Sequence, residues 1–192
     1  MSEPGYKQLI SYKLSQLAFI LGWEFVPKYY HRIEDSRQRD QIKQALRSFK
    51  QNIVEGSSER SLSRKLNLYD VAKSSSMEAL EDFEDILRFQ KLPRWNKDDL
   101  RLKKLRQIFE GYPFPSNSSV SSYPSVEGVS EVLGGLEGKE GIEAVVNYLI
   151  DLLVRAGYLL DHQINAVEEK HQREGGYNEK LLKKRLAYKR IL

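Results

Sequence analysis

Apolar residues recur every three or four positions over four long stretches of the chain, which is the period of an amphipathic α-helix. The stretches cover about residues 6–26, 36–55, 61–91 and 142–172. No segment alternates apolar and polar residues with the period of two that is typical of half-buried strands. The pattern therefore predicts an all-α fold, an up-and-down antiparallel four-helix bundle.

Prolines and glycines punctuate this pattern. Pro27 is expected to stop the first helix, and Leu92-Pro93 closes the third. Gly56 ends the second helix, and Gly175-Gly176 ends the fourth. These four helix ends divide the pattern into separate long helices of one bundle.

A short helix is expected between the third and fourth long helices. Asn96 can cap it and Asp99 lies in its first turn. Trp95 and Leu100 are placed to contact each other across its start.

Residues 111–141 differ in composition from the rest of the chain, because prolines, serines and glycines predominate there. Such a composition predicts a long, flexible loop inserted before the last helix. The predicted organisation is thus a bundle over residues 1–174, which contains the insertion, followed by a basic C-terminal tail at 175–192.

The second long helix has two distinct faces. Its apolar residues share one side of the helix and are Ile42, Ala45, Leu46, Phe49 and Ile53. Its basic residues form a stripe with spacings of four, four and three, and are Arg39, Lys43, Arg47 and Lys50. Repeated around a symmetric ring, this stripe would present a concentrated positive surface to phosphates. The alternative is a solvated face that is partly neutralised by Asp40 and by partners such as Glu84 from neighbouring elements.

The net charge of +4 is distributed unevenly. The last sixteen residues hold one acidic residue, Glu179, and six basic ones, Lys180, Lys183, Lys184, Arg185, Lys189 and Arg190. The remainder of the chain is close to neutral. Leucines, Tyr188 and Ile191 are interleaved with these charges, so the tail admits three partners: acidic bundle helices, nucleic acid, or anionic membrane. Candidate nucleic-acid contacts here are Lys183, Lys184, Arg185, Lys189 and Arg190.

Composition excludes several classes of function. The chain has no cysteine, so disulfides, thiolate metal sites and cysteine nucleophiles are ruled out. Hydrophobic content of 40% with 30% charged residues is typical of a well-charged helical protein. Neither an N-terminal leader pattern nor an apolar run of membrane-spanning length is present, so we expect a cytoplasmic protein without a membrane partner.

The catalytic motifs that the sequence suggests are incomplete. Glu168 and His171 have the spacing of a di-iron bundle motif, but no second Glu-x-x-His exists. Gly138-Lys139 lacks the glycine and the hydroxyl residue of a phosphate-binding loop. An acidic run on the third helix is interpreted as a solvated face or a subunit contact, and comprises Glu78, Glu81, Asp82, Glu84 and Asp85. We therefore predict no catalytic, metal or cofactor site.

Three stretches together resemble a known family of four-helix bundle proteins, whose members include proteins encoded within intervening sequences of bacterial 23S rRNA genes. The second helix carries Gln41-Ile42 through Ala45 and then Asn52-Ile53-Val54-Glu55-Gly56. The third carries Leu68 through Asp82, and the fourth Asn147 through Tyr177. The C-terminal part is similar to a subgroup in which the last bundle helix continues into a basic suffix.

This resemblance implies homo-oligomers, typically pentamers. It also implies a binding role, because relatives that accompany diversity-generating reverse transcriptases bind that enzyme and nucleic acid. We therefore expect a non-enzymatic, homo-oligomeric interaction protein that binds RNA, DNA or a nucleic-acid enzyme through its basic residues. The alternatives are a structural adaptor with an acidic protein partner, and a metal-dependent bundle enzyme centred on Glu168, His171 and the acidic third-helix residues.

Overall fold

The computed structural model describes residues 5–111 and 123–189, and within these two segments every regular element is helical. A short 3₁₀ helix, η1 (Gly5–Gln8), precedes the α-helices. These are α1 (Ile10–Tyr29), α2 (Ser36–Ser58), α3 (Leu62–Gln90), α4 (Leu100–Phe109), α5 (Val126–Val132), α6 (Gly138–Glu174) and α7 (Tyr177–Lys189). The predicted all-α class is confirmed.

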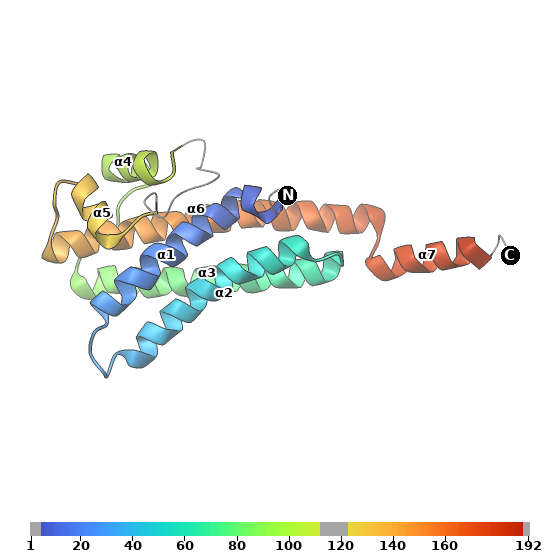
Figure 1. Ribbon diagram of the computed structural model, residues 1–192, viewed down its shortest axis with the longest axis horizontal. Helices are drawn as coiled ribbons and strands as arrows, with labels where there is room; N and C mark the ends of the chain where they lie inside the picture. Colours follow the sequence, from blue (N-terminus) through green and yellow to red (C-terminus); the bar gives the residue numbers. More distant parts are fainter. Residues whose placement is uncertain (1–4, 112–122, 190–192) are drawn as a thin grey trace.

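The four long helices pack side by side, and each has two long neighbours. α1 contacts α2 and α6, and α3 also contacts α2 and α6. Consecutive long helices run in opposite directions along the molecule (Figure 1). Their facing side chains form one core, in which the largest fully buried residues include Tyr148, Phe49, Phe83, Leu14 and Leu21.

α1 and α2 approach each other closely because α1 carries a glycine at their contact. A Cβ added at Gly22 would collide with the Leu46 side chain of α2. Leu46 is fully buried in the core. Because glycine has no side chain, α1 can lie close to α2 here, and the outward-facing residues of α1 next to Gly22 lie near the surface of α2.

α1 continues through Pro27 to Tyr29, so the prediction that this proline stops the helix is wrong. A proline in the last turn removes only one helical hydrogen bond. Val26 is buried, and its carbonyl accepts a hydrogen bond from the Tyr30 backbone N–H at 2.9 Å. The burial of Val26 beside the proline thus outweighs the loss of one helical hydrogen bond.

The predicted cap of the short helix is also wrong. α4 begins after Asp99, whose carboxylate accepts a hydrogen bond from the backbone N–H of Arg101 at 2.9 Å. Leu100 is 79% exposed, whereas Trp95 is buried, so the two do not meet across the helix start. Trp95 is drawn instead to α6, where its backbone N–H donates to Asn147 at 2.7 Å.

The segment predicted as a loop at 111–141 contains α5 and the first turn of α6. Ser125 caps α5 by accepting a hydrogen bond from Gly128 at 2.9 Å, and Val129 is fully buried. Valines three residues apart give this short helix an apolar face that packs on α6, which offsets its unfavourable composition. Part of the predicted insertion, residues 112–122, lies outside the described residues.

The last long helix ends at the predicted glycines. Gly175 has a φ of 74°, a conformation that favours glycine, and a second helix, α7, begins two residues later. α7 projects past the end of the four packed helices (Figure 1). Among the described helices, none is both long and apolar enough to span a membrane.

Candidate nucleic-acid interface

The basic stripe of α2 lies over aromatic rings of α1. The Nζ of Lys43 is 3.7 Å from the centroid of the Trp23 ring, and the Nζ of Lys50 is 3.8 Å from that of Phe19. The two rings belong to successive turns of α1, with centroids 5.1 Å apart. Gly22 lies between them in the sequence, and its close contact with α2 explains why the lysines reach the rings.

Arg47 completes this surface, which we name the cation–aromatic face: Phe19, Trp23, Lys43, Arg47 and Lys50. Arg47 is exposed, and Trp23 is 44% exposed. The pKa of Lys50 is lowered, first because burial penalises its charged form and second because Arg47 is near. The face therefore combines accessible positive charge with an accessible indole.

Within the described segments, no carboxylate pairs with Lys43, Arg47 or Lys50. Cation–π contacts hold the two ammonium groups in place, and such contacts stabilise an exposed pair by about 0.5–1 kcal/mol. A ring quadrupole, unlike a carboxylate, does not cancel the net charge of a lysine. These cations thus keep their attraction for an external anion.

Arg39, the fourth residue of the predicted stripe, is placed differently. Its guanidinium lies 3.8 Å from Asp40 and donates to the backbone carbonyl of Tyr30 at 3.4 Å. Asp40 thus neutralises part of the stripe, as the alternative interpretation predicted. Glu84 does not, because it pairs with Arg94 at 3.7 Å.

The predicted tail contacts lie on α7, apart from the α2 stripe (Figure 1). Lys183, Lys184 and Arg185 are all exposed. Lys189 is the last residue of α7, and Arg190 lies outside the described residues. The structure therefore brings three α2 cations together with two aromatic residues but leaves the tail cations as a separate cluster.

The aromatic half of the face was missed by the sequence analysis. Phe19 and Trp23 are four residues apart in the first helix and fall outside its apolar stripe. Two aromatic residues at helical spacing on the polar side are a usable signal. Their pairing with α2 lysines depends on how the two helices pack, which the sequence alone does not show.

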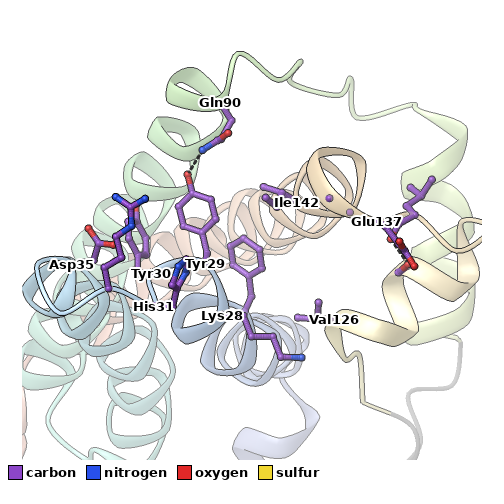
Figure 2. Close-up of a pocket in the computed structure, with 15 residues that line it drawn as sticks. Lys28, Tyr29, Tyr30, His31, Asp35, Gln90, Val126, Glu137 and Ile142 are labelled. Carbon is purple, nitrogen blue, oxygen red and sulfur yellow. Dashed lines mark hydrogen bonds between the residues drawn. The ribbon is translucent and has the colours of Figure 1, made fainter.

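A pocket of about 600 Å³ lies at the end of the molecule where α1 stops and α6 begins (Figure 2). Phe25, Tyr29 and Ile142 contribute apolar surface, and the Tyr29 hydroxyl accepts a hydrogen bond from Gln90 at 3.0 Å. Lys28, which also lines the pocket, is engaged by two carboxylates, Glu24 at 2.8 Å and Glu127 at 2.6 Å. The ammonium group of Lys28 is therefore already neutralised within the described residues.

A buried ionic network joins α4 to α6 and was not predicted. The Arg155 guanidinium donates to both oxygens of Glu110, at 2.8 and 2.6 Å, and to Asp151 at 3.1 Å. Arg106 donates to both oxygens of Asp151, at 2.9 and 2.5 Å. The Tyr148 hydroxyl donates to Glu110, and burial raises the pKa of this tyrosine well above its usual range. Every charge in this network has a partner, so the network fixes α4 against α6.

The candidate metal residues do not converge. Glu168 is exposed near the end of α6, and Asp161, about two helical turns before it, pairs with Lys73 at 2.6 Å. Among the residues that the structure describes, no three His, Asp or Glu side chains gather as a metal site would require.

Comparisons with known proteins return no relatives for this chain. A scan against protein-family models, a search of curated proteins and a search of solved structures each found no match.

Proposed function

We propose that this protein is a non-enzymatic, homo-oligomeric interaction protein that binds single-stranded RNA or DNA through its cation–aromatic face. In this proposal the fold is an up-and-down antiparallel four-helix bundle. The cyclic packing of α1, α2, α3 and α6 supports that architecture. So does the alternating direction of these helices in Figure 1.

One observation carries the functional proposal: Lys43 and Lys50 are held over Trp23 and Phe19 without a neutralising carboxylate among the described residues. Proteins that bind single strands combine cations for the phosphates with aromatic rings on which bases stack. Here Lys43, Arg47 and Lys50 supply the cations for the phosphates, and the half-exposed indole of Trp23 supplies the ring for base stacking. A surface stripe that only kept the protein soluble would not need an aromatic residue exposed within it.

Self-assembly is the second part of the proposal. It is motivated by the resemblance to four-helix bundle proteins, which implies a homo-oligomer, typically a pentamer. Large apolar side chains are exposed on the outer surfaces of the long helices, and Phe89 of α3 is 73% exposed. Apolar side chains in such positions suit a contact between subunits.

Fluorescence anisotropy with labelled single-stranded RNA and DNA at low salt tests the nucleic-acid proposal. The variant Lys43→Gln/Arg47→Gln/Lys50→Gln removes three cations and keeps side chains of similar length. Its matched control is Lys97→Gln/Lys103→Gln/Lys104→Gln, which removes three exposed cations in and just before α4. We expect at least a tenfold loss of affinity in the first variant and less than a twofold change in the control. Equal behaviour of the two variants would refute the assignment of the face.

A further inference from the structure

α7 projects from the four packed helices, and the contacts that it makes with the other described residues lie near its start, at Tyr177 and Lys180 (Figure 1). Four of its large apolar side chains are between 41% and 67% exposed: Leu181, Leu182, Leu186 and Tyr188. It also carries five basic residues and one acidic residue. An isolated helix of thirteen residues is only marginally stable in water unless it packs against another element, because helix nucleation is unfavourable. The composition of α7 thus points to a partner with acidic and apolar surface.

Such a surface lies on the outer side of α3. Val71, Glu78, Glu81, Asp85 and Phe89 are spaced by seven, three, four and four residues, so they share one face of the helix, which we name the α3 stripe. All except the partly exposed Asp85 are exposed. Three carboxylates are therefore flanked by two apolar side chains.

The charges around the stripe are only partly compensated. Asp85 pairs with Arg88. Asp82, beside the stripe, accepts a hydrogen bond from Gln38 at 2.6 Å through one oxygen. Its other oxygen is buried and has no partner among the described residues. Burial raises the pKa of the Asp82 carboxyl, and the negative charges of Glu78 and Asp85 raise it further, so these acidic groups lie close together.

α7, folded back along its own α3, would not bring its basic run level with the carboxylates of the α3 stripe. Tyr177, its first residue, lies beside Arg64 at the α2–α3 turn. Folded back along α3, the basic run Lys183–Arg185 would lie about 9–12 Å from that level, whereas Glu78 lies about 21 Å from it, at 1.5 Å per residue. In the structure α7 points away from α3 altogether (Figure 1).

We propose that α7 of one copy docks on the α3 stripe of a second copy. Leu182 and Leu186 then lie on the face of α7 that covers Val71 and the neighbouring surface. Lys183 and Arg185 flank these two leucines and face the carboxylates of the α3 stripe. The lengths agree, since α7 and the span from Val71 to Asp85 are each about 20 Å long. This inference rests on the proposed self-assembly and names the contact that produces it. Exchange can close as a dimer or continue around a ring.

Charge reversal tests the contact directly, with mass measured by light scattering after gel filtration. The α7 variant is Lys183→Glu/Lys184→Glu/Arg185→Glu, and the α3 variant is Glu78→Lys/Glu81→Lys/Asp85→Lys. Each alone should shift from the assembly to the 22.3 kDa monomer. An equimolar mixture should reassemble, because each α7 then meets an α3 of opposite charge. The control Lys97→Glu/Lys103→Glu/Lys104→Glu should assemble like the wild type.

Cross-linking provides a second readout in chains whose fold is checked by circular dichroism. Because the protein has no cysteine, Leu182→Cys and Glu81→Cys can be placed in separate chains and mixed with a bismaleimide. A covalent heterodimer is expected, and its absence in an assembled sample would overturn the contact.

The remaining outcomes separate the two proposals. A wild-type protein that stays monomeric at every concentration refutes the proposed self-assembly and the contact with it. A wild-type assembly that survives both charge reversals overturns the α7 contact alone. Loss of RNA binding without loss of assembly in the α7 variant also overturns it, because α7 would then be a nucleic-acid segment.

Discussion

Lys43 holds its ammonium group 3.7 Å from the centroid of the Trp23 ring, across the contact between α2 and α1. This relationship joins a cation to a stacking surface, and it exists because Gly22 lets the two helices approach. A lysine that is positioned by a ring remains charged and available to phosphate.

Replacing Trp23 by alanine should weaken binding to single-stranded RNA. Stacking of one base on an aromatic side chain contributes about 1–3 kcal/mol, so the Kd should rise between about fivefold and 150-fold. Trp23→Phe should retain most of the affinity. Tyr158→Ala removes an exposed aromatic residue from α6 and serves as the control. A Trp23→Ala variant that binds like this control would show that no base stacks on the indole.

Glu110→Ala should destabilise the protein strongly. It leaves the Arg155 guanidinium without its bidentate partner and the Tyr148 hydroxyl without an acceptor. Removing one member of a buried ion pair costs about 3–5 kcal/mol, which urea denaturation can measure. The double variant Glu110→Leu/Arg155→Met should recover a large part of this loss, because Asp151 keeps Arg106. A double variant as unstable as the single one would contradict the pairing.

Two glycine substitutions should have different outcomes. Gly22→Ala places a methyl group against Leu46 in the core and should cost about 1–3 kcal/mol through overpacking. In Gly157→Ala the nearest atom is the Ser76 hydroxyl at 3.7 Å, an ordinary contact, and the gain in helix propensity is about 0.5–1 kcal/mol. Thermal denaturation should thus show a lower midpoint for the first and an unchanged or higher midpoint for the second. Equal shifts would mean that α1 and α2 are not in close contact at Gly22.

The link between α1 and α5 should depend on pH. The hydrogen bond from Lys28 lowers the pKa of Glu127 to about 2, below its usual value of 4.5. Because the pKa is depressed in the folded protein, the stabilisation is present above pH 4.5 and is lost as the pH falls towards 2. The pair is exposed, so its contribution is within about 1 kcal/mol. The stability difference between wild type and Glu127→Gln should shrink over this range, and a constant difference would contradict the assignment.

Apolar periodicity predicted the four long helices because each buries a continuous stripe of side chains. The Gly175 break was also predictable, since it requires a positive φ. α5 was not, because its buried Val129 lies among residues typical of loops. The extension of α1 past Pro27 was not predictable either, because the packing that holds it comes from residues distant in the sequence.

The candidate site was half predictable. Four basic residues of α2 were predicted to form one stripe, and three of them, Lys43, Arg47 and Lys50, lie on the cation–aromatic face. The fourth, Arg39, pairs with Asp40 instead. Phe19 and Trp23 were not connected with them, because contacts between helices depend on the packing angle and on Gly22. The Glu110–Arg155 pair links residues forty-five positions apart, and no local pattern indicates it.

The salt dependence of RNA binding tests the central claim most directly. Each cation that contacts a phosphate contributes about 0.7 to the slope of log K against log salt concentration for a single strand. The Lys43→Gln/Arg47→Gln/Lys50→Gln variant should therefore show a slope about 2 smaller in magnitude than the wild type, with the Lys97/Lys103/Lys104 control unchanged. Identical slopes for all three proteins would show that the cation–aromatic face does not contact the nucleic acid.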